Sequence, residues 1–320
     1  MWLTLRPFLP ILLAATAGCP PPVHPTPAPA AAPAKQVALT GASVMIGAGD
    51  IAGCAQNHDF KTAKLVDSVL KADSVAKVTD AVFTLGDNAY MFGSTSQFAQ
   101  CFTPTWGDPG KSIMGKIHPS PGNHDYETAG AGPYFTYFGS KAGEPGLGYY
   151  SYDVGTWHVV ALNSEIVLLE SYSDADRAAQ GAWLLKDLTD HKKQQCTLAY
   201  WHEPRFSSGY HGSDLRFTPI WRILYDNGVD LVLNGHDHDY ERFAPQTPDG
   251  VADSTGITEI VAGTGGEELR GFGGRAIRNS VFRIEGHAGV LVLTLGSAEY
   301  RSAFLDEGGA VWDPSGGKCR

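Results

Sequence analysis

The chain has 320 residues, 43% of them hydrophobic and 18% charged, so it is long and apolar enough to bury a large core and is not a disordered tail. Its 24 Lys and Arg against 34 Asp and Glu leave a net charge of -10, which argues against nucleic acid or anionic lipid as a partner. The 38 Gly and 20 Pro predict many loops, as in an α/β or all-β enzyme and unlike a helical bundle.

Residues 1–19 have the features of a secretory signal peptide. One positive charge, Arg6, precedes an apolar run at 8–17 that is too short to span a bilayer as a permanent anchor. The run Thr16-Ala17-Gly18-Cys19 resembles the lipobox of bacterial lipoproteins, although Thr16 stands where Leu is usual. We therefore expect export to the bacterial periplasm or cell surface with a lipid anchor at Cys19. The alternative is ordinary cleavage and secretion, with Cys19 an incidental thiol.

A linker separates this signal from the folded part of the chain. Residues 20–36 are rich in Pro and Ala, a composition that favours extended backbone and cannot pack a core. Residues 37–320 contain no second linker and no internal repeat, so we predict one domain.

The domain contains four cysteines, and an even number in an exported chain favours disulfides. They are Cys54, Cys101, Cys196 and Cys319. Of the three possible pairings we favour Cys54 with Cys101 and Cys196 with Cys319. A cysteine metal site is disfavoured because no C-x-x-C spacing occurs.

Four short apolar runs each end at a glycine or at residue types that bind metals. These runs predict strands over residues 43–48, 81–85, 197–201 and 230–233. The residues that follow them are Gly49-Asp50, Gly86-Asp87-Asn88, His202, and Asn234-Gly235-His236. Since open α/β sheets bind ligands at the carboxyl ends of their strands, we expect one functional site there.

The other predicted elements are helices and further strands. A nearly helical spacing of apolar residues between the first two strands predicts an amphipathic helix and a β-α-β start; it involves Leu65, Val66, Val69, Leu70 and Val78. Further helices are expected over 174–189 and 217–227, and further strands over 157–162, 258–262 and 289–295. The buried side of the 174–189 helix is expected to carry Trp183, Leu184, Leu185 and Leu188. This order of elements suits two sheets with flanking helices.

The polar residues at the predicted strand ends form a set of metal-ligand types. They are Asp50, Asp87, Asn88, Tyr90, Asn123, His124, Asp125, His202, His236, Asp237, His238 and Asp239. Carboxylate, imidazole and amide donors suit ions such as Fe, Mn and Zn, and a carboxylate such as Asp87 can bridge two of them. Each motif alone is also typical of a turn or of a buried histidine, but all of them in this order are an improbable coincidence.

In this order the motifs resemble those of the calcineurin-like metallophosphoesterases. The segments are Gly49-Asp50, Gly86-Asp87-Asn88-Ala89-Tyr90, Gly122-Asn123-His124-Asp125, His202 and Gly235-His236-Asp237-His238-Asp239-Tyr240-Glu241-Arg242. Tyr90, three residues after Asp87, and the final Tyr-Glu-Arg are most similar to the purple acid phosphatase branch. The resemblance spans roughly residues 44–300 and implies a four-layer α/β/β/α sandwich with both metals at the carboxyl ends of strands.

The resemblance also assigns ligands and metals. It implies a first metal held by Asp50, Asp87, Tyr90 and His238, and a second held by Asp87, Asn123, His202 and His236. Iron paired with Fe, Zn or Mn is expected, because a tyrosine ligand favours a trivalent ion. The sequence departs from the family at Ala52, where many members have a second histidine ligand, and Tyr90 can take that place.

The resemblance implies a hydrolase in which a metal-bound hydroxide attacks a small phosphate monoester, as in acid phosphatases. His124 resembles the acid that protonates the leaving oxygen, and Asp125 would orient its ring. We expect Asn123, His211 and Arg205 to contact the substrate. Membrane contact is expected only through the lipid anchor, and nucleic acid is not expected to bind. A phosphodiesterase or nucleotide pyrophosphatase on the same core, and a catalytically silent surface binding protein, are the alternatives.

Two further segments have less specific interpretations. The glycine-rich run at 263–266 is expected to be a turn, although such runs also bind anions. The aromatic residues between 134 and 152 are expected to pack in the core.

Overall fold

The computed structural model describes residues 42–55, 57–76, 80–194 and 196–320. The predicted signal peptide, the Cys19 lipobox, the linker and Val78 lie outside the described residues.

Two β-sheets form the centre of the described structure. The first has the order β13-β12-β11-β1-β2-β3, with β1, β2 and β3 parallel and the other neighbours antiparallel. Its strands are β1 (Ser43–Ala48), β2 (Asp80–Leu85), β3 (Ile117–Ser120), β11 (Gly289–Leu295), β12 (Glu299–Asp306) and β13 (Val311–Lys318). The β1-α1-β2 unit is thus parallel, as predicted.

The second sheet has the order β10-β8-β9-β7-β6-β5-β4, and β5, β6, β7 and β9 are parallel. Its strands are β4 (Tyr150–Val154), β5 (Trp157–Ala161), β6 (Cys196–Tyr200), β7 (Leu231–Asn234), β8 (Tyr240–Phe243), β9 (Thr258–Ala262) and β10 (Ser280–Ile284). Every strand predicted from the sequence is present, with ends that differ by at most one residue.

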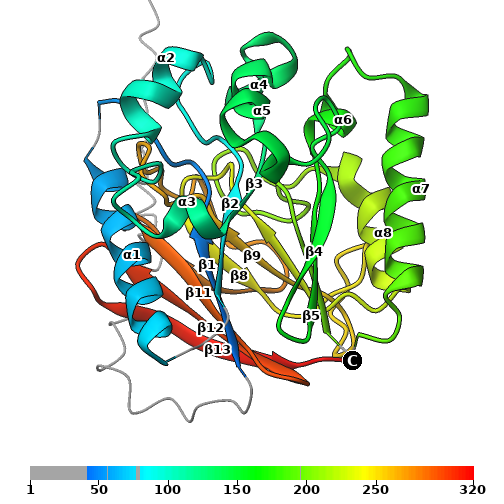
Figure 1. The fold of residues 1–320 in the computed structure, drawn as a ribbon. Helices are drawn as coiled ribbons and strands as arrows, with labels where there is room; N and C mark the ends of the chain where they lie inside the picture. The colour runs from blue at the N-terminus through cyan, green and yellow to red at the C-terminus, as the bar shows by residue number, and fades with distance from the viewer. Residues whose placement is uncertain (1–41, 56, 77–79, 195) are drawn as a thin grey trace, which may run out of the picture.

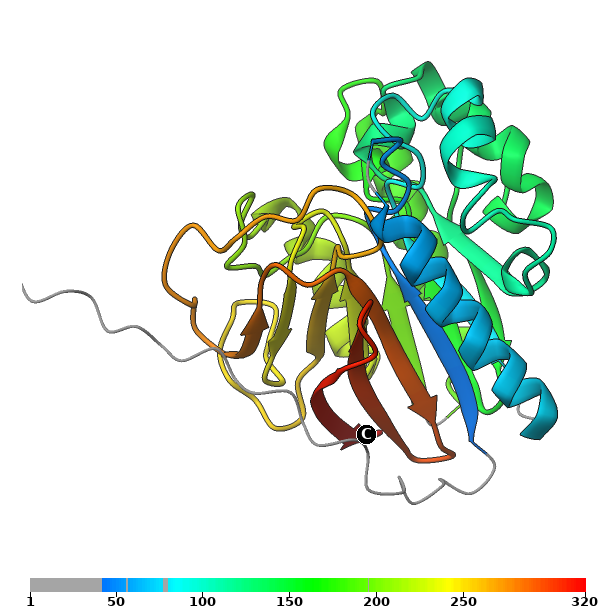
Figure 2. The same ribbon diagram turned by 90° about the vertical axis from the view of Figure 1, so that its left-hand side faces the viewer.

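Three long helices cover the outer faces of the two sheets (Figure 1). They are α1 (His58–Ala76), α7 (Asp174–Asp190) and α8 (Thr218–Asp226). Figure 2 shows α1 running alongside β1. Shorter helices and helical turns are α2 (Thr95–Gln97), η1 (Phe98–Phe102), α3 (Ile113–Lys116), α4 (Asn123–Tyr126), η2 (Ala129–Ala131), α5 (Gly132–Phe138), η3 (Gly139–Ala142), α6 (Glu165–Leu168) and η4 (Leu215–Phe217).

Three apolar clusters fill the spaces between these layers. One lies between the sheets and joins residues such as Phe83 and Leu293 of the first sheet to Leu198 of the second. Another joins α1 to the outer face of the first sheet, and a third joins α7 and α8 to the outer face of the second. The predicted four-layer α/β/β/α sandwich is confirmed.

The buried face of α7 differs from the prediction at one position. Leu184 and Leu188, four residues apart, share the buried face, whereas Leu185 is 48% exposed. The reason is geometric, because a one-residue step rotates the side chain by about 100° around the helix. Trp183 is only partly buried, and its ring packs against Tyr149.

Two disulfides link segments that are distant in the sequence. Cys54 is bonded to Cys101 and Cys196 to Cys319, so the predicted pairing is confirmed. The bonds close loops with separations of 47 and 123 residues, which restricts the unfolded chain. Among the described helices, none has the length and apolar character required to cross a bilayer.

Candidate metal centre

Three of the predicted ligands occupy left-handed turns directly after strands. Asp50 follows β1 with φ 59°, Asp87 follows β2 with φ 49°, and His236 follows β7 with φ 69°. Such backbone costs of order 1–3 kcal/mol per residue and persists only where surrounding contacts impose it. Residues in this conformation cluster at functional sites, and these three meet at one edge of the sandwich.

The first group of donors surrounds Asp50. The Tyr90 hydroxyl lies 2.6 Å from Asp50 Oδ1 and 2.9 Å from Asp87 Oδ2. The Nε2 atom of His238 lies 3.2 Å from Asp50 Oδ1 and 3.3 Å from the Tyr90 oxygen. All four residues are almost completely buried.

A second group shares Asp87 with the first. Its Oδ2 atom lies 3.1 Å from His202 Nε2, which is 3.2 Å from Asn123 Oδ1 and 3.3 Å from His236 Nδ1. The structure therefore brings all seven predicted ligands together, in two groups with Asp87 between them.

Backbone groups fix the orientation of the ligand side chains. The Nδ1 atoms of His202 and His238 lie 2.6 and 2.5 Å from the carbonyl oxygens of Leu85 and Glu268, which leaves both Nε2 atoms facing the site. The backbone N–H of His236 donates to Asp50 Oδ2 at 2.8 Å. Such outer contacts fix ring orientation and tautomer in metal sites.

The electrostatics of the site suit a cation. Burial opposes ionisation of Asp50, but the charges of His238 and His202 hold its pKa below the usual value. Burial likewise opposes protonation of His202, but the Asp87 and Asp50 carboxylates raise its pKa well above the usual value. Among the described residues, neither Asp50 nor Asp87 forms an ion pair with a Lys or Arg. Buried carboxylates, imidazoles, an amide and a phenol without a fixed cation are a donor set that fits two metal ions.

The sequence match covers all seven of these residues. Residues 47–240 match the family described as calcineurin-like phosphoesterase. The chain belongs to this family. The resemblance predicted from the motifs is confirmed.

Curated relatives include purple acid phosphatases. The chain is 28% identical over 219 residues to purple acid phosphatase 15 of Arabidopsis thaliana, covering 58% of this chain and 40% of the relative. It is 26% identical over 202 residues to acid phosphatase type 7 of Homo sapiens, covering 55% and 43%. The chain thus aligns to less than half the length of these relatives.

Solved structures share the fold at low identity. Purple acid phosphatase PPD1 from yellow lupin (Lupinus luteus) seeds has a TM-score of 0.73 at 20% identity, over 86% of this chain and 53% of that chain. GAP50, described as the anchor in the inner membrane complex of Plasmodium, has a TM-score of 0.70 at 16% identity, over 87% and 89%.

In this calcineurin-like phosphoesterase, His124 faces the donors, but Asp125 does not orient its ring. The Nδ1 atom of His124 lies 2.7 Å from the Met91 carbonyl oxygen, and its Nε2 atom is 3.9 Å from Asp87 Oδ2. The Asp125 carboxylate instead accepts from the N–H groups of Asn88 and Gly122, because it turns back to cap its own short helix, α4. Burial and the nearby Asp87 charge raise the pKa of Asp125 to about 7. The prediction for Asp125 is therefore corrected: it braces the Asp87-Asn88 turn.

Of the two other residues predicted to contact the substrate, His211 lines the cavity beside the site and Arg205 does not. His211 stacks on His236 with ring centroids 4.1 Å apart, and its Nδ1 atom lies 3.1 Å from Asp237 Oδ1. The prediction for Arg205 is corrected, because its buried guanidinium donates to the Pro248 carbonyl at 3.0 Å and does not reach the cavity beside the site.

This cavity has a volume of about 410 Å³ and opens beside the second donor group. It is lined by Asn123, Glu165, Leu168, Leu169, Glu203, Pro204, His211, Gly212, Ser213, Asp214, Arg216 and His236. The sequence interpretation missed Glu165 and Glu203. Both could have been found, since Glu203 directly follows His202 and Glu165 ends the polar run after the predicted strand at 157–162.

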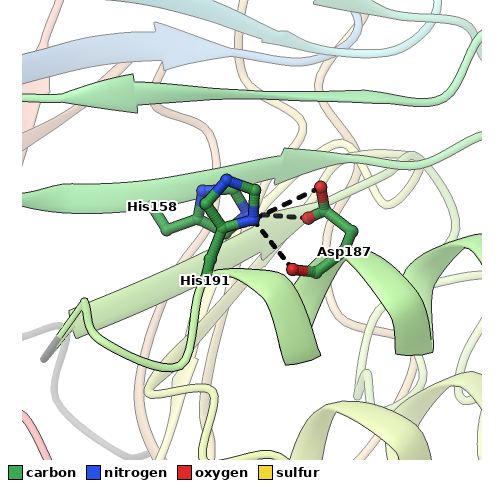
Figure 3. A group of neighbouring side chains, drawn as sticks. All are labelled: His158, Asp187 and His191. Carbon is green, nitrogen blue, oxygen red and sulfur yellow. Dashed lines mark hydrogen bonds and ion pairs between the residues drawn. The ribbon is translucent and has the colours of Figure 1, made fainter.

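A separate cluster, formed by His158, Asp187 and His191, lies at the C-terminal end of α7 (Figure 3). His158 of β5 has Nδ1 3.0 Å from Asp153 and Nε2 2.7 Å from Asp187, and it stacks on His191 with centroids 3.8 Å apart. Burial lowers the pKa of His158, but its bonds to Asp187 and Asp153 outweigh this and raise it. Because both ring nitrogens already have carboxylate partners, this cluster is a clamp between β5 and α7.

The glycine-rich run at 263–266 makes structural backbone contacts. The backbone N–H of Gly265 donates to the Gly49 carbonyl at 2.8 Å, beside the turn that contains Asp50. Part of the predicted aromatic stretch is also structural: Tyr134, Phe135 and Phe138 are the buried residues of α5 and pack in the core.

Proposed function

We propose that this protein is a dimetal hydrolase of phosphate monoesters. One observation carries the proposal: seven metal-ligand donors from both sheets converge in two groups that share Asp87. Membership of the phosphoesterase family and similarity to acid phosphatases support it. When bound, the two cations supply Lewis-acid activation and positive charge against the phosphoryl oxygens. Asp50, Asp87, Tyr90 and His238 would hold one ion, and Asp87, Asn123, His202 and His236 the other.

His124 is proposed as the proton donor to the departing alcohol. The Met91 carbonyl accepts from Nδ1–H, so Nε2 points toward the donor groups and can hold the proton at the reacting side. Asn123 and His211 line the cavity beside that point and are proposed to contact the substrate. Proton transfer by a positioned histidine typically contributes 10²–10⁴-fold to rate.

Iron, paired with Fe, Zn or Mn, is proposed for the two sites. The Tyr90 oxygen lies within 2.9 Å of both carboxylates, and a bound ion that displaced its proton would be held by the phenolate that suits a trivalent ion. Visible absorption of the iron-loaded protein that disappears in Tyr90→Phe would support this assignment. A colourless and fully active iron-loaded protein would exclude it.

A phosphodiesterase is the second candidate, because the cavity beside Asn123 and His236 has room for a second ester group. Initial rates on p-nitrophenyl phosphate and bis(p-nitrophenyl) phosphate, after loading with Fe, Zn or Mn, separate the two activities. A strong monoester preference supports the proposal and a diester preference supports the second candidate. Failure to cleave either ester with metal bound would refute both and favour a silent binding protein.

Export is proposed from the signal-like N-terminus, and the two disulfides support an oxidising compartment. Labelled palmitate should enter the wild type but not Cys19→Ala if the lipid anchor is correct. Equal labelling of both would refute the anchor.

A further inference from the structure

Two buried glutamates, Glu165 and Glu203, line the cavity beside the proposed metal centre and are not among its seven proposed ligands. Glu165 is 1% exposed and Glu203 4% exposed. Within the described residues, Oε1 of Glu165 and both carboxylate oxygens of Glu203 have no hydrogen-bond partner. A buried carboxylate without a partner is costly, so these oxygens are available to a ligand that satisfies them.

The fold brings these two side chains together from neighbouring strands. Glu203 follows β6, and Glu165 starts α6 just after β5. β5 and β6 are parallel and directly paired, so their carboxyl ends open on the same edge. The two glutamates are therefore built into the rigid sheet edge that also holds His202.

The other charged side chains of the cavity have hydrogen-bond partners outside this pair of glutamates. The Arg216 guanidinium is engaged by Asp214, with Nε 3.0 Å from both carboxylate oxygens. His211 is held between Asp237 and Arg270, at 3.1 and 3.0 Å. The nearby Leu168, Leu169 and Pro204 give the cavity an apolar wall. Carboxylate oxygens that accept hydrogen bonds, placed beside an apolar wall, fit a ligand with a short aliphatic chain that ends in a cationic amine.

We propose that this cavity selects phosphate esters of amino alcohols, with Glu165 and Glu203 receiving the ammonium group while the phosphate lies at the donor groups. The inference rests on the proposed phosphatase function. The reaction remains hydrolysis: the ester P–O bond breaks, water supplies the new P–O bond, and the amino alcohol leaves with a proton. An ester with an anionic substituent would meet like charge and is disfavoured.

The metal-loaded full chain should be assayed on 2-aminoethyl phosphate and 2-hydroxyethyl phosphate, which differ only in an ammonium or a hydroxyl group. We expect kcat/KM to favour the amine by on the order of tenfold or more, the effect of hydrogen bonds to a charged group. p-Nitrophenyl phosphate is the reference substrate. Turnover of it without amine preference overturns the inference alone, whereas no turnover of any ester overturns the proposed function.

The variants Glu165→Gln and Glu203→Gln keep side-chain size and replace the carboxyl group by an amide. In both, the amine-to-hydroxyl ratio should fall toward one, while exposed Glu144→Gln, outside the cavity, should keep the wild-type ratio. Calorimetry gives an independent readout, because ethanolamine should bind the wild type in the presence of phosphate and bind both variants more weakly. The inference would be overturned if the amine-to-hydroxyl ratio of kcat/KM were unchanged in both variants. It would also be overturned if the wild type bound a third metal ion per chain that Glu203→Gln removed.

Discussion

Replacing Gly86 by alanine should inactivate the protein by displacing His202. Gly86 has φ +82°, and a Cβ there would lie 2.5 Å from Nδ1 and 2.6 Å from Cγ of the His202 ring. Ordinary contact begins near 3.4 Å, so the ring must move by about 0.9 Å. That movement also disrupts the 2.6 Å contact between His202 Nδ1 and the Leu85 carbonyl. A misplacement of about 1 Å can cost 10²-fold in rate, so we expect kcat/KM to fall about 100-fold.

Gly228→Ala is the matched control. Gly228 has φ +78°, and a Cβ at this position meets no atom within 4 Å. Both variants therefore carry a similar left-handed backbone cost of about 1–2 kcal/mol, measurable by urea unfolding. Only Gly86→Ala should also lose metal content and turnover of p-nitrophenyl phosphate. If Gly86→Ala stays within a few-fold of Gly228→Ala in both readouts, the steric argument for His202 is wrong.

Three further predictions concern protons. Burial and the Lys141 charge lower the pKa of His118 from 6.5 to about 4. Between these two pH values the unfolded chain binds a proton at His118 and the folded chain does not, so the free energy of unfolding falls as the pH is lowered. The wild type should lose about 2–3 kcal/mol relative to His118→Phe between pH 7 and 4, and parallel urea curves would refute this. The pKa of His158 is raised in the folded state, so its protonated form adds to the free energy of unfolding. This contribution is fully present below pH 6.5, the pKa in the unfolded chain, and is lost as the pH rises through the folded-state pKa. The advantage of wild type over His158→Gln should therefore shrink from pH 6 to 9, and a constant difference would contradict the clamp. His124→Ala should lower turnover more for alkyl than for nitrophenyl phosphate, whereas equal losses would remove it as the acid.

Local patterns were sufficient for most of the fold. Apolar runs bounded by glycine predicted the strands, because a buried strand needs a continuous apolar segment and a turn to end it. The 3.6-residue period predicted α1, α7 and α8 for the same kind of reason. Leu185 was misplaced because a run of adjacent leucines does not show which of them faces the sheet.

The composition of the proposed metal-ligand set was also readable from the sequence. Asp50, Asp87, His202 and His236 each follow an apolar run, and parallel strands bring such positions to one edge of a sheet. The family resemblance then selected Tyr90, Asn123 and His238 as ligands from the twelve polar residues at the predicted strand ends, because strand patterns alone do not separate ligands from ordinary turn residues.

Roles that depend on side-chain direction were decided only by the tertiary structure. Arg205 and Asp125 have the right chemistry and nearly the right position, yet one guanidinium turns to the Pro248 carbonyl and one carboxylate turns to its own helix N-terminus. Glu165 and Glu203 are 38 residues apart in the sequence and meet in the cavity only because β5 pairs with β6. Chain order thus determines which residue types reach the edge of the sandwich. Packing between the two sheets determines which way each side chain points, and therefore which of them share the site.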